Sequence, residues 1–157
     1  MIPRINKILY ATDLSVGASH AFGYAVSIAT NINAKISIIN VHESPSHNIN
    51  IKMRSEDFPT AKTKLTNKIK ARLLQYSQKE GDEDCTFSNL INEIYITSGN
   101  PVEEIIDQAK EGGYDLIVMG THGHGFLYSA LIGSTAKRVI TQSEVPVLVV
   151  RLPESIA

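Results

Sequence analysis

Glycine and hydroxyl residues stand at fixed spacing in the last quarter of the chain. The pattern is Gly120-x2-Gly123-x9-Gly133-Ser134, and it follows the apolar run Leu116–Met119 and opens a segment with helical spacing. The unpaired N–H groups of a helix start attract phosphate, and glycines let the main chain approach it without a Cβ in the way. The hydroxyls of Ser134 and Thr135 could add donors. The stretch predicts a phosphate-binding loop between a strand and a helix.

A loop whose glycines only supply left-handed turns is the alternative interpretation. Two better-known phosphate motifs are ruled out, because no Lys follows the glycines as in GxxxxGK[ST] and no GxGxxG is present. His122 and His124 could bind a metal ion, but no further Cys, His or carboxylate clusters with them in the local sequence, so we predict no metal site. His42 fits a solvent-facing strand end as well as a pocket. Cys85 stands beside acidic residues, which argues against a reactive thiol.

Length and composition predict one domain spanning residues 1–157. The chain has 157 residues and is 43% hydrophobic, which suits a globular domain with a sizeable core. With 15 basic and 16 acidic residues the net charge is −1, so no overall field attracts nucleic acid or an anionic membrane. One cysteine excludes an internal disulfide, no apolar run is long enough to span a bilayer, and residues 1–7 lack a secretory segment. We expect a cytoplasmic protein without nucleic-acid or membrane partners.

Hydrophobic spacing predicts strands that alternate with helices along the chain. We expect strands over 8–12, 36–41, 91–97, 115–119 and 145–150, and helices after Ser15, from about 59, from 101 and over 134–142. Residues 44–58 are expected to form a long loop. Alternating strands and helices give a parallel sheet covered on both faces, with ligands at the carboxyl ends of strands where the strand order reverses. Asp13 and Gly120 both lie at such ends.

Several local signals define the predicted helices. Asp13 or Ser15 can cap the first helix, and Asn100-Pro101-Val102-Glu103 combines a capping Asn, a first-turn Pro and a Glu three residues after the cap. The apolar stripes expected to face the core are Ala21, Phe22, Ala25, Ile28, Ala29 and Ile32 in the first helix, Ala61, Leu65, Ile69 and Leu73 in the second, and Val102, Ile105, Ile106 and Ala109 in the third. We expect Lys62, Lys64, Lys68 and Lys70 to face solvent, and Pro146 to lie at a strand start or on an edge strand.

Over nearly its full length the chain resembles the universal stress protein family. The resemblance is carried by Ala11-Thr12-Asp13 after the first strand, by Val41 at the end of the second, and by the spaced glycines with Ser134. It implies an α/β domain, a three-layer sandwich with a five-stranded parallel sheet of strand order 3-2-1-4-5. It also implies a homodimer paired through the last strand, here Val145 to Val150, and a bound ATP or AMP, with Mg²⁺ accompanying ATP.

The resemblance also implies which residues hold the nucleotide. Around adenine and ribose would stand Ala11, Thr12, Asp13 and Val41, and around ribose and phosphates Met119, Gly120, His122, Gly123, Gly133, Ser134 and Thr135. Asp13 could hydrogen-bond a ribose hydroxyl or the adenine edge and still cap a helix. Two positions depart from the family pattern. His124 stands where many nucleotide-binding members have Arg or Lys, so it offers less countercharge to phosphate, and Thr135 replaces a common Val.

Three functions are compatible with the sequence. The first is a regulatory protein in which a bound adenine nucleotide changes contacts with a partner. The second is an enzyme that slowly hydrolyses ATP; because the glycine loop contains no carboxylate to position water or a metal ion, we expect hydrolysis to be slow or absent. The third is a nucleotide-free dimerisation module that uses Val145 to Val150.

Overall fold

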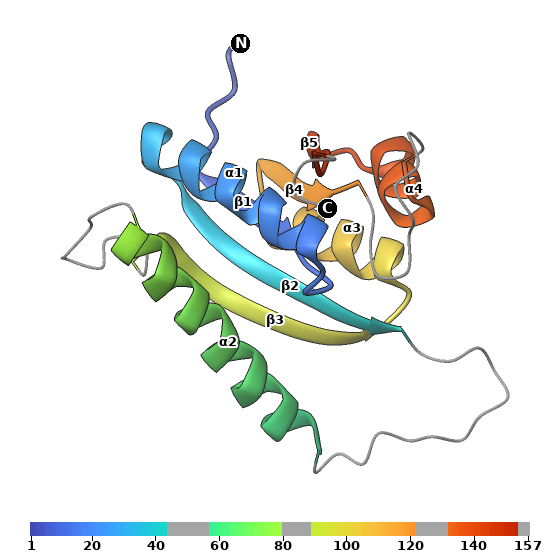
Figure 1. Cartoon of the computed structure of the whole chain (residues 1–157). Helices are drawn as coiled ribbons and strands as arrows, with labels where there is room; N and C mark the ends of the chain where they lie inside the picture. The colour runs from blue at the N-terminus through green and yellow to red at the C-terminus, as the bar shows by residue number, and fades with distance from the viewer. Residues whose placement is uncertain (44–56, 80–88, 122–131, 154–157) are drawn as a thin grey trace, which may run out of the picture.

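A computed structural model describes residues 1–43, 57–79, 89–121 and 132–153 of the chain. Strands and helices alternate in them, and Figure 1 shows their arrangement. Their bounds are β1 Lys7–Ala11, α1 Val16–Ile32, β2 Lys35–Glu43, α2 Asp57–Lys79, β3 Ile91–Gly99, α3 Pro101–Glu111, β4 Leu116–Gly120, α4 Ser134–Gln142 and β5 Val147–Val150. Every predicted element is found, although α2 starts two residues before Pro59, which the first turn of a helix tolerates. Residues 44–56 of the predicted loop lie outside the described residues.

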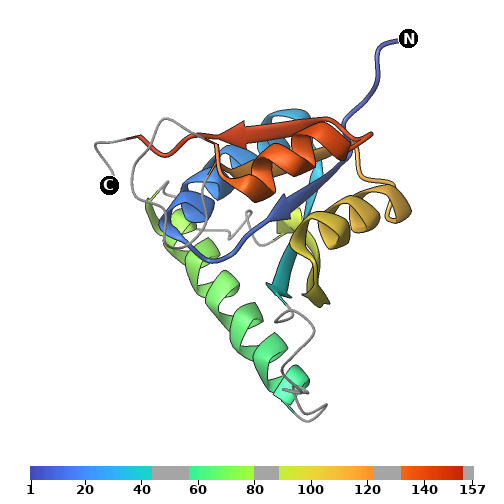
Figure 2. The same cartoon turned by 90° about the vertical axis from the view of Figure 1, so that its right-hand side faces the viewer.

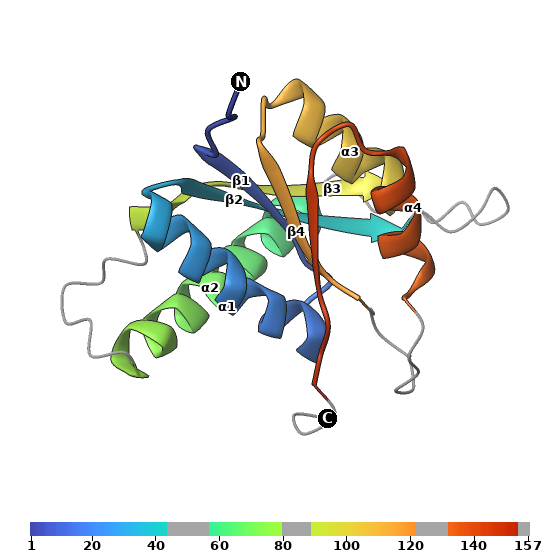
Figure 3. The ribbon, with the colours of Figure 1, turned by 90° about the horizontal axis from the view of Figure 1, so that it is seen from above.

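The five strands form one parallel sheet of order β3-β2-β1-β4-β5, as the family resemblance implies. From β1 the chain adds β2 and β3 on one side, then returns to place β4 on the other side of β1. The strand order therefore reverses between β1 and β4, where the helices that follow these strands lie on opposite faces. Figure 3 shows α1 and α2 on one face of the sheet and α3 and α4 on the other.

Each face of the sheet has its own apolar core. Ile8, Ile36 and Val118 point toward α1 and α2, whereas Leu9, Ile39 and Ile117 point toward α3 and α4. Burial on both faces explains why the central strands are almost continuously apolar rather than alternating. No helix in the described ranges has the length and apolar character that crossing a bilayer would require.

Most of the predicted core stripes are confirmed. In α1 the exception is Ile32, which is 45% exposed because it is the last helical residue before the chain turns at Asn33, whose φ is 57°. In α2, Leu65 and Ile69 are buried, and the four lysines predicted to face solvent are exposed. Ala61 and Leu73 fall outside the described side chains. Figure 2 shows α2, in green, running obliquely beside the sheet on the same side as α1.

A tyrosine pair lies in the layer between the sheet and α3. The hydroxyls of Tyr95 on β3 and Tyr114 before β4 are 3.0 Å apart. Burial, together with hydrogen bonds to Glu93 and Tyr114, raises the pKa of Tyr95. The Lys7 ammonium lies 4.7 Å from the centre of the Tyr114 ring, a cation–π contact. This cluster ties β1, β3 and β4 together.

Candidate functional site

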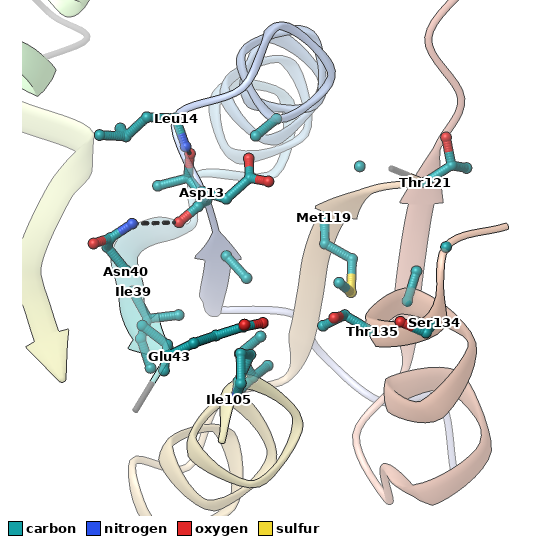
Figure 4. A pocket seen from close by; sticks show the side chains of 18 of the residues that line it. Asp13, Leu14, Ile39, Asn40, Glu43, Ile105, Met119, Thr121, Ser134 and Thr135 are labelled. Carbon is teal, nitrogen blue, oxygen red and sulfur yellow. Dashed lines mark hydrogen bonds between the residues drawn. The ribbon is translucent and has the colours of Figure 1, made fainter. Parts of the chain in front are cut away.

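A pocket of about 560 Å³ opens where β1, β2 and β4 end. This is the carboxyl edge of the sheet at the point where the strand order reverses, and the starts of α3 and α4 form its far wall. The volume lies in the range that small-molecule ligands occupy. Figure 4 shows it from close by. The lining residues are Ala11, Thr12, Asp13, Leu14, Ala18, Ile39, Asn40, Val41, His42, Glu43, Pro101, Ile105, Met119, Gly120, Thr121, Gly133, Ser134, Thr135 and Ala136.

The turn between β1 and α1 forms one side of the pocket. Thr12 Oγ1 accepts a hydrogen bond from the Leu14 amide at 3.0 Å, and Asp13 Oδ1 accepts one from the Ser15 amide at 2.9 Å. These bonds hold Leu14 in the left-handed region at φ 66°, a conformation that non-glycine residues rarely adopt. Ser15 is the helix cap, since its Oγ accepts from the Ala18 amide at 3.2 Å. The Asp13 carboxylate therefore orders the turn and borders the pocket.

Asn40 on β2 fixes the position of this turn. Its Nδ2 donates to the carbonyl oxygen of Thr12 at 2.8 Å, the dashed bond in Figure 4, and both residues are buried. The Thr12 amide in turn donates to the Ile39 carbonyl at 3.0 Å. The link between β1 and β2 thus continues one residue beyond the end of β1.

The opposite side of the pocket is formed by the end of β4 and the start of α4. The Thr121 amide donates to the Val150 carbonyl at 3.1 Å, and the Gly133 amide donates to the Thr121 carbonyl at 2.8 Å. The two ends of segment 122–132 are therefore held together at the edge of the sheet. Helix α4 starts at the pocket, and its N-cap residue, Gly133, makes no side-chain capping bond.

Helix α4 differs from α1 and α3 in how it begins. Ser15 and Asn100 each cap their helix with a side chain, whereas Gly133, the N-cap of α4, makes no such bond. Helical bonding in α4 begins with the Lys137 amide, which donates to the Gly133 carbonyl at 3.0 Å. The amides of the first turn of α4, before Lys137, carry the partial positive charge of the helix start. This end of the pocket favours an anion.

The structure brings together most of the residues that the sequence singled out. Two of the predicted site residues, His122 and Gly123, lie outside the described residues. His42, for which two placements were open, lines the pocket. The others all line it as well: Ala11, Thr12, Asp13, Val41, Met119, Gly120, Gly133, Ser134 and Thr135.

Sequence reasoning missed three polar residues of the pocket, namely Asn40, Glu43 and Thr121. Asn40 lies inside an apolar strand, and no local pattern shows that its side chain reaches the Thr12 carbonyl. Glu43 could have been found, because alternation along β2 places Ile39, Val41 and Glu43 on one face of the sheet.

The charged side chains that line the described part of the pocket are both acidic. Asp13 and Glu43 border it, and neither Lys nor Arg stands among its described lining residues. Figure 4 shows the Glu43 side chain reaching across the pocket from the end of β2, past Ile105 and toward Thr135. In the described ranges, no three His, Cys, Asp or Glu side chains gather as a metal site would need.

A doubly wound parallel sheet with a pocket at its switch point places this chain in the α/β class, in which ligands generally bind at the carboxyl edge of the strands. The chain belongs to the universal stress protein family, whose model matches residues 4–151. It is 32% identical to universal stress protein MJ0577 of Methanocaldococcus jannaschii over 96% of this chain and 97% of that protein. It is 31% identical to YxiE of Bacillus subtilis, covering 93% and 99% of the two chains.

Solved structures of this family have the same fold. That of MJ0577, described as a structure-based assignment of biochemical function, superposes with a TM-score of 0.66 at 29% identity, covering 97% of this chain and 99% of that one. A universal stress protein crystallised in complex with cAMP superposes with a TM-score of 0.60 at 24% identity, covering 94% and 98%. At that identity the second likeness supports the fold alone.

Proposed function

We propose that this universal stress protein is a regulatory protein that binds an adenine nucleotide in the pocket at the ends of β1, β2 and β4. The observation that carries the proposal is the start of α4, which lacks a side-chain cap and opens on a pocket of about 560 Å³. A helix start of this kind binds phosphate through its amides and its dipole. The description of one structural neighbour as a cAMP complex agrees with such a ligand.

The two ends of the pocket differ in chemistry, as a nucleotide requires. Ile39, Val41 and Ile105 give the end near β2 and α3 an apolar surface on which a base can lie. The other end holds the start of α4 with the hydroxyl residues Ser134 and Thr135. We place adenine and ribose beside Ala11, Thr12, Asp13 and Val41, and ribose and phosphates beside Met119, Gly120, His122, Gly123, Gly133, Ser134 and Thr135.

ATP and AMP are the proposed ligands, with Mg²⁺ arriving on ATP. Regulation would follow from binding, because a nucleotide seated between the β1–α1 turn and α4 changes the surface that a partner meets. We also propose that two copies of the chain form a homodimer through Val145 to Val150. Its support is the position of β5 at the edge of the sheet, with Val147, Leu148 and Val149 only half-buried.

Calorimetry of the full chain with ATP, AMP and cAMP tests the proposal. We expect one site per chain, and Thr135→Ala, at the start of α4, should weaken binding of the phosphorylated ligands. Thr141→Ala is the matched control, because Thr141 bonds the Lys137 carbonyl at the far end of the same helix. Absence of binding by all three nucleotides at millimolar concentration would contradict the proposal. Several turnovers per minute of ATP hydrolysis by pure protein would instead favour an enzyme.

A further inference from the structure

We propose that Glu43 makes the pocket select adenine nucleotides of low phosphate charge, such as AMP or cAMP, over free ATP. This inference rests on the proposed function. It starts from the placement of Glu43, which follows Ile39 and Val41 on the same face of β2 and lines the pocket. Its side chain extends across the pocket toward the start of α4, where the phosphates are placed (Figure 4).

The balance of charge around the pocket is the first argument. The described lining contains two carboxylates, Asp13 and Glu43, and neither lysine nor arginine. The amino-acid sequence extends this argument, because the whole segment from Gly120 to Ala136 contains no Lys or Arg, and Lys137 is the first basic residue after it. Attraction of phosphate thus relies on the amides and dipole of α4, which together equal about half a charge, and on histidines.

The electrostatic consequence depends on the number of phosphates. The start of α4 offsets part of the charge of a single phosphate group, and each further phosphate adds negative charge without a Lys or Arg in the described lining to match it. Repulsion by the Glu43 carboxylate grows with that charge and acts across a partly enclosed pocket, where solvent screens less than in bulk water. Adenosine carries no charge, so the Glu43 carboxylate does not repel it.

The two pocket carboxylates have different roles in this scheme. Asp13 accepts a hydrogen bond from the Ser15 amide and orders the β1–α1 turn, so the local structure accounts for its presence. Glu43 is exposed at the last position of β2, and within the described ranges its carboxylate has no comparable structural use. Of the two, Glu43 is therefore the residue whose charge can be altered without disturbing the site.

Calorimetry of the full chain with adenosine, cAMP, AMP, ADP and ATP tests this inference. The measurements use EDTA to remove divalent cations, fixed ionic strength, and about pH 8, where unperturbed histidines are neutral. We expect wild-type affinity to fall from AMP to ATP. Glu43→Gln should raise the affinity for AMP about threefold and for ATP about tenfold, while adenosine binds as before. Glu43→Lys should raise the affinity for every charged ligand further than Glu43→Gln does.

Glu111→Gln is the control, because it makes the same change in net charge at the exposed end of α3 that lies away from the pocket. Thermal unfolding confirms that each variant is folded. The inference would be overturned if wild-type protein bound free ATP more tightly than AMP, or if Glu43→Gln shifted affinities no more than Glu111→Gln. If neither adenosine nor any nucleotide bound, the proposed function would be wrong, and this inference with it.

Discussion

Gly120, at the end of β4, lies in direct backbone contact with Gly17 in the first turn of α1. A Cβ at position 120 would stand 3.1 Å from both the carbonyl carbon and the carbonyl oxygen of Gly17, and 3.3 Å from the Ala18 amide. These neighbours are main-chain atoms, so they cannot swing aside as a side chain could. The two glycines set the spacing between β4 and α1 at the edge of the pocket.

Replacing Gly120 with Val should therefore move α1 away from β4. We expect a loss of about 2 kcal/mol in unfolding free energy from overpacking, and a loss of nucleotide binding because the β1–α1 turn moves as well. Urea unfolding and calorimetry measure the two effects. Gly113→Ala is the control: it strains a φ of 65° by about 1 kcal/mol, yet lies at the other end of β4, so binding should survive. Unchanged stability and binding in Gly120→Val would show that the contact is dispensable.

The Asn40 bond to Thr12 should matter for both stability and binding. Asn40→Leu keeps the size of the side chain but leaves the buried Thr12 carbonyl without its donor, which costs about 1–3 kcal/mol. Nucleotide affinity should fall as well, because the β1–α1 turn is no longer held. Asn31 Nδ2 donates a similar bond to the Ser27 carbonyl at 2.8 Å, at the exposed end of α1. Asn31→Leu removes this bond and should change stability and affinity little. Equal effects of both substitutions would contradict a special role for Asn40.

The tyrosine pair predicts how stability changes in alkaline solution. The pKa of Tyr95 is raised above the ordinary value of 10.0, so the folded state holds its proton more tightly than the unfolded chain does. The stabilising contribution is full below about pH 10 and is lost as the pH rises further. Tyr95→Phe should flatten this loss when urea unfolding is compared at about pH 8 and about pH 11. Tyr24→Phe, at an exposed tyrosine, should keep the wild-type profile.

The outer edge of β5, to which no described strand is paired, gives a test of the dimer. The Pro146 carbonyl accepts from the Ile117 amide in β4, and the Val150 carbonyl accepts from the Thr121 amide just after β4. Alternation along the strand therefore places the main-chain groups of Val149 on the outer edge. Val149→Pro should remove an outward N–H without breaking the bonds to β4. Sedimentation of this variant should then show monomers, and its thermal unfolding should occur near the wild-type temperature. Val149→Thr keeps the N–H and should remain dimeric. A wild-type chain that is monomeric at every concentration would disprove the dimer.

Much of the fold could be predicted because its signals are local. Asn100 accepts from the amides of Val102 and Glu103 at 2.9 and 3.3 Å, as its position before Pro101 predicts. Pro146 comes directly before β5, at the edge of the sheet, where a missing N–H is tolerated. The strand order could not be predicted from local signals, and its prediction rested on the family resemblance.

The pocket was predictable only in part. Residues next to strand ends, such as Asp13 and Gly120, follow from the rule that ligands bind at carboxyl edges. Asn40 could not be found in this way, since its role depends on a pairing between β1 and β2 that sequence spacing does not reveal. The contact of Gly120 with Gly17 is likewise visible only in three dimensions, because α1 packs on a strand about a hundred positions later in the chain.

The hydrogen bond between Gly133 and Thr121 has an evolutionary consequence. Because it closes the base of the intervening stretch, insertions, deletions or wholesale replacement between these two positions need not disturb the sheet. Related proteins could thus acquire new ligand preferences by exchanging one short peptide while the scaffold stays constant.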